Sequence, residues 1–176
     1  MSQGPAGGLA RVVCRAGPGR VTCDLGPDGV VAVRLRVGRA ALARSIPGPP
    51  GSRLWALAAR AAAALEAFLR GGSWDELARL PVAWPAAASP FDLDVWRALR
   101  RIPAGATASY GAIARRLKRP GAARAVGGAC GRNPLPLIVP CHRVLPAGGG
   151  LGGFSAGLAW KEWLLALEGW RDERRR

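Results

Sequence analysis

A cysteine and the only histidine of the chain are neighbours in the segment Pro140-Cys141-His142-Arg143-Val144, which directly follows the apolar run 137–139. A cysteine attacks as its thiolate, so it needs a base or a positive charge nearby, and His142 and Arg143 provide both. This pattern indicates a nucleophilic thiol activated by an imidazole. The alternative is a buried, inert cysteine beside a histidine of the core, since free cysteines are usually of that kind.

The positive charge of the chain is large and unevenly distributed. The formal net charge is +15, and only Lys118 and Lys161 are lysines, so nearly all of the positive charge is arginine. Because alanine, glycine and proline are also abundant, part of this total reflects a coding bias. The stretch 115–132 is more informative, since it carries six basic residues and no acidic one. Such a run is typical of a surface that binds a polyphosphate backbone, with a solvated face as the alternative.

The sequence favours a cytoplasmic protein without membrane association. Residues 1–11 are glycine-rich and lack the apolar core of a secretory signal, and the apolar stretch 54–69 is interrupted by Arg60 and Glu66. Four cysteines in an intracellular chain argue against a disulfide framework. No CxxC pair is present, so we expect no metal site. A disulfide between Cys14 and Cys23 is an alternative if the two face each other across a hairpin.

The chain divides into two expected domains, residues 1–88 and 89–176, and its fold class is expected to be α+β. Three short extended runs within 11–37 are separated by Gly17-Pro18-Gly19 and Pro27-Asp28-Gly29, which predicts a three-stranded antiparallel meander. Residues 54–69 are helical by composition. The alanine- and proline-rich segment 81–89 has no clear period and is the expected linker.

The second half begins with three predicted helices. Ser89-Pro90 opens the first, with Asp92 as a capping-box-like partner. Ser109 can cap the second. The third, residues 122–130, consists almost entirely of small residues, from which Arg124 projects. Two short basic helices joined by a tight turn are typical of a helix-turn-helix module, with ordinary three-helix packing as the alternative.

A glycine-rich loop, residues 147–153, leads into a last predicted helix. Trp160, Trp163, Leu164 and Leu167 recur there at the helical period and are expected in the core. Glu168 stands at the end of this helix, where it is either a surface residue or a carboxylate that orients an imidazole.

Five motifs follow one another at compatible spacing over about residues 90–169: Ser109-Tyr110-Gly111, the stretch 122–129, Asn133-Pro134, Pro140–Val144, and Lys161-Glu162-Trp163-Leu164-Leu165. Together they closely resemble the methylated-DNA–protein-cysteine methyltransferases, also called O6-alkylguanine-DNA alkyltransferases. The N-terminal half resembles this family in outline only. The fold implied is a small ribonuclease-H-like domain ahead of a winged helix-turn-helix catalytic domain.

The resemblance implies that Cys141 accepts the alkyl group of O6-alkylguanine in duplex DNA. In the family's arrangement Glu168 orients His142, which removes the thiol proton through a bound water. Tyr110 donates a hydrogen bond to the departing guanine. The thioether product has no good leaving group, so each molecule would react once. The implied activity is single-turnover methyl transfer in direct-reversal DNA repair.

The damaged base has to rotate out of the duplex, and Arg124 resembles the family's arginine finger on a helix expected in the minor groove. The residues implied to contact DNA are Ser109, Ala123, Arg124, Ala125, Gly127 and Gly128. Asn133 would tie the recognition segment to the catalytic turn, and backbone near Val144 would contact the guanine edge. The residues implied around the base are Tyr110, Cys130, Asn133, Val144, Phe154 and Ser155. Lys161 and Glu162 are expected to be framework.

Two departures from the family concern the pocket: Phe154 stands where tyrosine is common, and Ala156 where some relatives have glycine. Both bear on which bulky alkyl groups fit. The zinc ligands found in the N-terminal domain of some relatives cannot be assembled here, because Cys14 and Cys23 have no histidine partner. We therefore expect neither metal nor cofactor.

Two other function classes account for part of this pattern. A damage sensor of the alkyltransferase-like type would flip the base without repair, but that class lacks the acceptor cysteine. A thiol hydrolase would need an oxyanion hole and would have no use for the basic helix. We expect a monomer that acts on double-stranded DNA. The sequence leaves open cooperative binding along DNA, the alkyl size accepted and the repair of O4-methylthymine.

Overall fold

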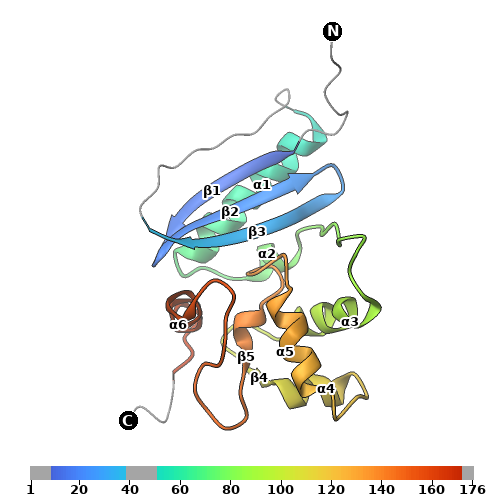
Figure 1. Ribbon diagram of the computed structural model, residues 1–176. Coiled ribbons are helices and arrows are strands. Elements are labelled where there is room, and N and C mark those ends of the chain that lie inside the picture. Colours follow the sequence, from blue (N-terminus) through green and yellow to red (C-terminus); the bar gives the residue numbers. More distant parts are fainter. Residues whose placement is uncertain (1–8, 39–50, 172–176) are drawn as a thin grey trace. The chain divides into compact units, whose positions relative to one another are not determined.

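The computed structural model describes residues 9–38 and 51–171 and has a mixed α+β fold (Figure 1). The chain forms two compact units, Met1–Pro85 and Ala86–Arg176. Within the described ranges no helix is both long and apolar enough to cross a lipid bilayer.

The first unit contains the predicted meander, which is confirmed. Strands β1 (Ala10–Ala16), β2 (Gly19–Gly26) and β3 (Gly29–Val37) form an antiparallel sheet in the order β1-β2-β3. Alternate residues are buried along β1, whereas residues 23–26 of β2 are all buried. The sheet packs against α1 (Arg53–Leu69), the helix predicted from composition. The side chain of Ser52 caps α1, and the short α2 (Asp75–Ala78) follows.

The two cysteines of this sheet are free and buried, so the disulfide considered from the sequence is wrong. The register places Cys14 opposite Val21 and Cys23 opposite Val12, so the two cysteines are diagonal neighbours and not a facing pair. The pKa of Cys23 is raised to about 12, first by burial and then by the charges of Asp24 and Cys14. Such a thiol is inert at neutral pH.

The first residues of the predicted linker belong to the first unit. Val82 pairs with Val30 in a parallel bridge, the amide of Val30 donates to the carbonyl of Pro81, and the amide of Ala83 donates back to Val30. The structure divides the chain after Pro85, slightly ahead of the expected boundary.

The second unit is mainly helical. Its helices are α3 (Pro90–Leu99), α4 (Tyr110–Arg116), α5 (Ala123–Gly131) and α6 (Leu158–Leu167), with a single 3₁₀ turn η1 (Cys141–Arg143). Two short strands, β4 (Ala108–Ser109) and β5 (Val144–Leu145), pair in parallel.

The predicted helix starts are confirmed by their caps. The hydroxyl of Ser89 accepts from the amide of Asp92, 3.1 Å away, and that of Ser109 accepts from the amide of Ala112 at the same distance. Helices α3, α4 and α5 pack on one another, and the indole Nε1 of Trp96 donates to the carbonyl of Ala129 at 2.9 Å.

The predicted core face of the last helix is only partly correct. Trp160 and Leu164 are buried, as expected, but Trp163 and Leu167 are half-buried. Lys161 and Leu165 are buried in addition. The buried stripe is therefore rotated by about one residue, because the ammonium of Lys161 finds hydrogen-bond acceptors inside the unit.

Candidate active site

The cysteine–histidine pair lies on the η1 turn, between a buried segment and a strand. Residues 137–139 ahead of it are fully buried, and Val144 after it begins β5. Because β5 pairs with β4, the start of α4 is held beside this turn, and Tyr110 is the first residue of that helix.

Asn133 forms hydrogen bonds around the thiol of Cys141. Its Nδ2 donates to the carbonyl of Val139 at 2.8 Å and to Sγ of Cys141 at 3.0 Å, while its Oδ1 accepts from the amide of Leu135 at 3.0 Å. Since Asn133 directly follows the α5 region, it joins that helix to the reactive turn. The structure thus places Asn133 in the linking position expected from the sequence.

Cys141 is 4% exposed, and burial raises the pKa of its thiol. The Asn133 amide, the Lys161 charge and backbone amides act in the opposite direction but do not outweigh burial. The resting group is therefore a thiol, and attack by its sulfur requires a base that removes the proton.

His142 is fully buried, with Nε2 lying 3.0 Å from Oε1 of Glu168. Burial tends to raise the pKa of Glu168, but its hydrogen bonds to His142 and Arg143 outweigh burial and lower the pKa to about 2. An ionised Glu168 fixes the tautomer of the ring, because Nε2 must carry the proton that it donates. Nδ1 is then the unprotonated nitrogen. It is buried and has no hydrogen-bond partner in the part of the chain that the structure describes.

Arg143 pairs with Glu168, whereas the sequence suggested that its positive charge would act on the Cys141 thiol. It is fully buried and donates through Nε and Nη2 to Glu168, at 2.9 and 2.7 Å, and through Nη1 to the carbonyl of Ile102 at 2.6 Å. Its charge is thus directed to the carboxylate and not to the thiol. The amide of Gly105 donates a further bond to Glu168 at 3.3 Å. Sequence reasoning missed this ion pair.

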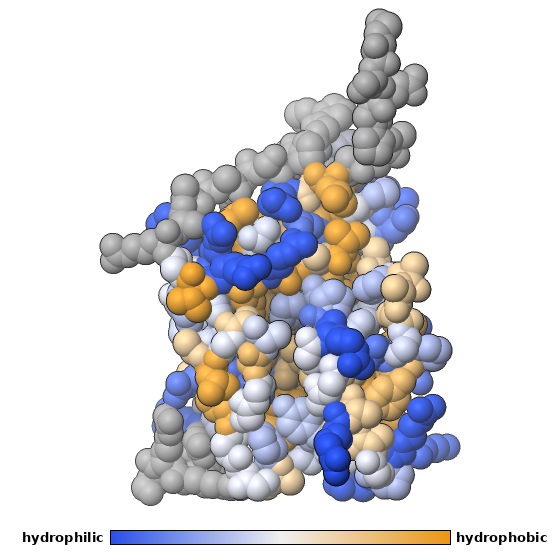
Figure 2. All heavy atoms as spheres, in the orientation of Figure 1, coloured by the Kyte–Doolittle hydropathy of each residue, from blue (hydrophilic) through white to orange (hydrophobic). Residues whose placement is uncertain are grey.

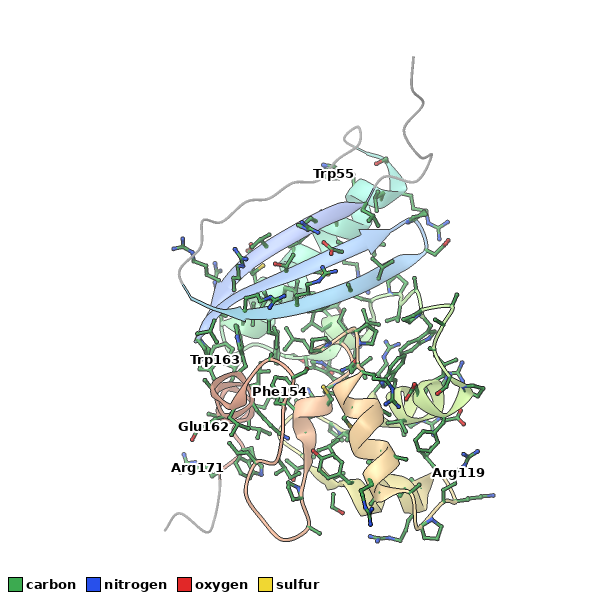
Figure 3. The ribbon with its side chains drawn as sticks, viewed as in Figure 1. Trp55, Arg119, Phe154, Glu162, Trp163 and Arg171 are labelled. Atoms are coloured by element: carbon green, nitrogen blue, oxygen red, sulfur yellow. The ribbon has the colours of Figure 1, made fainter. Side chains whose placement is uncertain are left out.

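A cavity of about 310 Å³ opens beside the thiol. Phe154 comes from the loop that enters α6 (Figure 3). Burial, followed by the two cysteines of the cavity, raises the pKa of Tyr110, so its phenol keeps its proton and can donate. Burial raises the pKa of Cys130 to about 12. The lining residues are Tyr110, Gly127, Cys130, Gly131, Cys141, Gly153, Phe154 and Ser155.

Two of the six residues expected around the base do not line this cavity. Asn133 is behind the thiol, and Val144 is fully buried. The carbonyl of Val144 accepts from Nζ of Lys161 at 2.8 Å, and the same ammonium donates to the carbonyl of Gly153 at 3.2 Å. Lys161 therefore links β5, which directly follows η1, to the loop that lines the cavity.

Helix α5 borders the cavity on one side and carries basic charge to the surface. Arg124 and Ala125 are exposed, and Gly127 lines the cavity, where a Cβ added at this residue would lie 3.8 Å from the Tyr110 ring. Ala123, Gly128 and Ser109 are half-buried. Arg132, at the end of the basic run, is engaged instead in a two-bond ion pair with the buried Asp92, at 2.7 and 3.2 Å.

The site carries no evident metal ligand set. Among residues 9–38 and 51–171 no group of three or more histidine, cysteine, aspartate or glutamate side chains could hold a metal ion.

Comparison with known proteins identifies the class to which this unit belongs. Residues 90–170 match the DNA-binding domain of 6-O-methylguanine DNA methyltransferase. A methylated-DNA–protein-cysteine methyltransferase of Salmonella typhimurium is 54% identical over 82 residues, which cover 47% of this chain and 48% of that protein. One of Methanosarcina acetivorans is 48% identical over 105 residues, covering 60% and 65% of the two chains. The matched region thus spans about half to two thirds of the length of these curated relatives.

A solved structure extends the similarity over both units. The crystal structure of Mycobacterium tuberculosis OGT in complex with DNA is 34% identical, with a TM-score of 0.70, and the match covers 89% of this chain and 90% of that one. The chain therefore belongs to the methylated-DNA–protein-cysteine methyltransferase family.

Proposed function

We propose that this protein repairs DNA by direct reversal, moving the alkyl group of O6-alkylguanine irreversibly onto Cys141. The observation that carries the proposal is the position of a buried thiol on the wall of a 310 Å³ cavity that α5 borders, with His142 next to it in the chain and hydrogen-bonded to Glu168. A base that has left the duplex needs a cavity of this kind. Family membership and the relatives' names support the same reading.

The proton of the thiol passes through a bound water to Nδ1 of His142, and Glu168 stabilises the imidazolium that results. Sγ of Cys141 then attacks the alkyl carbon attached to O6. The C–S bond forms as the C–O6 bond breaks, and the electron pair of the broken bond goes to the guanine. The guanine takes up one proton from solvent, and the imidazolium of His142 releases the thiol proton to solvent, so the products are a thioether on the protein and an unmodified base.

Tyr110 has the properties that stabilisation of the leaving base requires. Its phenol lines the cavity and retains its proton at neutral pH, so it can donate to the negative charge that develops on guanine. Ser155 lines the same cavity and is proposed to contact the guanine oxygen, with backbone near Val144 at the base edge.

The DNA-binding element in this proposal is the helix-turn-helix formed by α4 and α5, within a winged domain of residues 89–176. Arg124, exposed on α5, is proposed to fill the space that the flipped base leaves. Residues 1–88 are proposed to be the ribonuclease-H-like domain. The activity needs no cofactor, and a cytoplasmic location is part of the proposal.

Restriction cleavage of a repaired duplex tests this function. A duplex is prepared with one O6-methylguanine inside a restriction site that the lesion blocks. The protein is expected to restore cleavage in proportion to the amount added, up to one site per molecule. A damage sensor would bind the duplex and leave it uncut, and a thiol hydrolase would leave it both unbound and uncut.

A further inference from the structure

Arg143 is a fully buried cation inside the candidate active site. Hydrophilic side chains lie in several clusters on the molecular face that Figure 2 shows, but none of the surface of Arg143 is exposed. A buried guanidinium is costly unless a carboxylate and further hydrogen-bond acceptors surround it. Arg143 has both, in Glu168 and the carbonyl of Ile102. The proposed reaction uses Glu168 and His142, but it gives the charge of Arg143 no part.

The carboxylate of Glu168 is shared between His142 and Arg143. Its Oε1 lies 3.0 Å from Nε2 of His142 and accepts from Nη2 of Arg143 at 2.7 Å. Its Oε2 accepts from Nε of Arg143 at 2.9 Å. All three side chains are at most 1% exposed. The carboxylate, the guanidinium and the imidazole therefore form one cluster that is shielded from solvent.

The net charge of this cluster depends on the protonation of His142. With Glu168 ionised, Arg143 charged and the ring neutral, the charges cancel. A proton on His142 would then leave a net charge of +1 inside the unit. If residue 143 were uncharged, the same proton would instead bring the cluster to neutrality. Because a buried net charge is costly, Arg143 disfavours the imidazolium in the resting protein.

Other charged groups near His142 act less strongly or pair elsewhere. Burial is the largest cause of the lowered pKa of His142, and Glu168 acts against it. The charges of Arg143 and then of Lys161 lower this pKa further. Cys141, the preceding residue, has a raised pKa and is a neutral thiol. Of the remaining charged residues on the two helices packed against η1, Glu162 is exposed, and those of α3 lie in ion pairs, Asp92 with Arg132 and Asp94 with Arg97.

We propose that Arg143 is a positioning residue whose buried charge offsets that of Glu168, so that His142 stays an uncharged proton acceptor in the resting protein. Glu168 can then orient the ring through Nε2 without drawing a proton from solvent onto Nδ1. The imidazolium forms only when the thiol proton arrives, together with a thiolate that balances its charge. This inference rests on the proposed function for the reaction that uses the base.

His142 is the only histidine of the chain, so the signals of its ring in an NMR titration need no assignment. The titration gives the pKa of His142 without DNA and without a reaction. Arg143→Gln removes the buried charge, and Arg143→Lys keeps it. Arg132→Gln is the matched control for the titration, because Arg132 also donates two bonds to a buried carboxylate, that of Asp92. Circular dichroism shows which variants are folded.

In Arg143→Gln, the pKa of His142 is expected to rise above 6.5, whereas it is expected to stay below 6.5 in the wild type, in Arg143→Lys and in the control. More than half of the rings of Arg143→Gln are then protonated at pH 6.5. Its single-turnover rate at pH 6.5 is therefore expected to be less than half its rate at about pH 8, while the wild-type rates are equal. A purely structural role of Arg143 would lower both rates alike.

A folded Arg143→Gln variant whose ring is still mostly neutral at pH 6.5 would overturn the inference. If that variant does not fold, Arg143→Lys decides, because it keeps the charge, and a mostly protonated ring at pH 6.5 in this variant would overturn the inference as well. Either result leaves the proposed function intact, since uptake of a methyl group by the wild type is measured separately. A wild-type protein that takes up no methyl group would overturn the proposed function, whatever the titration shows.

Discussion

At the scale of single residues, the proposed nucleophile Cys141 is a protonated thiol next to the neutral imidazole of His142. Burial raises the pKa of Cys141 and lowers that of His142 from its ordinary value of 6.5, so neither group is charged at neutral pH. In the proposed reaction the proton therefore leaves Cys141 for His142, whose ring is held by its hydrogen bond to Glu168.

The rate of alkyl transfer is expected to be level from about pH 8 down to 6.5 and to fall at lower pH, where His142 gains a proton and can no longer accept one. The rate falls on the acid side because the pKa of His142 lies below 6.5, so the ring is neutral throughout the plateau. Single-turnover rates across this pH range check it. A rate that rises tenfold per pH unit from 7 to 9 would instead show that only a freely ionised thiolate reacts.

Replacing Glu168 with glutamine is expected to destabilise the fold by about 3 to 5 kcal/mol, because it leaves the buried guanidinium of Arg143 without its carboxylate. Asp94→Asn is the matched control. Asp94 is half exposed and lies 3.7 Å from Arg97, so its loss is expected to cost no more than about 1 kcal/mol. Urea unfolding of both variants measures the difference, and similar losses would contradict the account.

The sequence could predict a candidate site at Cys141 and His142, because the two residues are neighbours in the chain. It could not predict that Arg143 pairs with Glu168, 25 residues further on, or that Lys161 is buried. Both charged groups are stabilised by acceptors that only the tertiary structure brings together.

At the scale of elements, Asn133 joins the α5 region to the reactive turn through bonds to Val139 and Cys141. Asn133→Ala is expected to slow alkyl transfer about 10- to 100-fold, because the donor that favours the thiolate is lost, and such hydrogen bonds to charged groups contribute about 1.5 to 3 kcal/mol. Rapid-quench kinetics at saturating damaged DNA measure the rate.

The control for that variant is Ser89→Ala, which removes the cap of α3 and touches no reacting group. It is expected to lower stability by about 1 kcal/mol without changing the rate at saturation. An equal loss of rate in both variants would show that Asn133 acts only through the stability of the unit.

The starts of α3 and α4 could be predicted from the sequence. Ser89 and Ser109 cap α3 and α4 because a serine hydroxyl can accept from the free amides of a first turn, and this preference is local. The buried side of α6 was less predictable. Periodicity alone assigned Trp163 and Leu167 to the core, but Lys161 and Leu165 are buried in addition to Trp160 and Leu164.

At the scale of the whole molecule, acid is expected to unfold the protein between about pH 4.5 and 2. The pKa of Glu168 falls from 4.5 to about 2 on folding, so its stabilising contribution is present above 4.5 and is lost as the pH falls toward 2. Asp24 and Asp92, whose pKa values are also lowered by arginine partners, add to the effect. Unfolding free energies from pH 7 to 3 check this, and a value independent of pH below 4.5 would contradict it.

The division into two units was visible in the sequence as a change from strand patterns to capped helices. Its position was less certain from sequence, because the pairing of Val82 with Val30 extends the first unit into the alanine- and proline-rich segment. The ribonuclease-H-like and winged helix-turn-helix assignments stay predictions.

The central claim is that Cys141 takes up one alkyl group and keeps it. The most direct measurement is the intact mass of the protein after incubation with excess duplex DNA that carries one O6-methylguanine, with Cys141→Ala as control. We expect an increase by one methylene mass that saturates at one per molecule and is absent from the variant. Binding of the duplex without a change in mass, or an equal increase in the variant, would contradict the account.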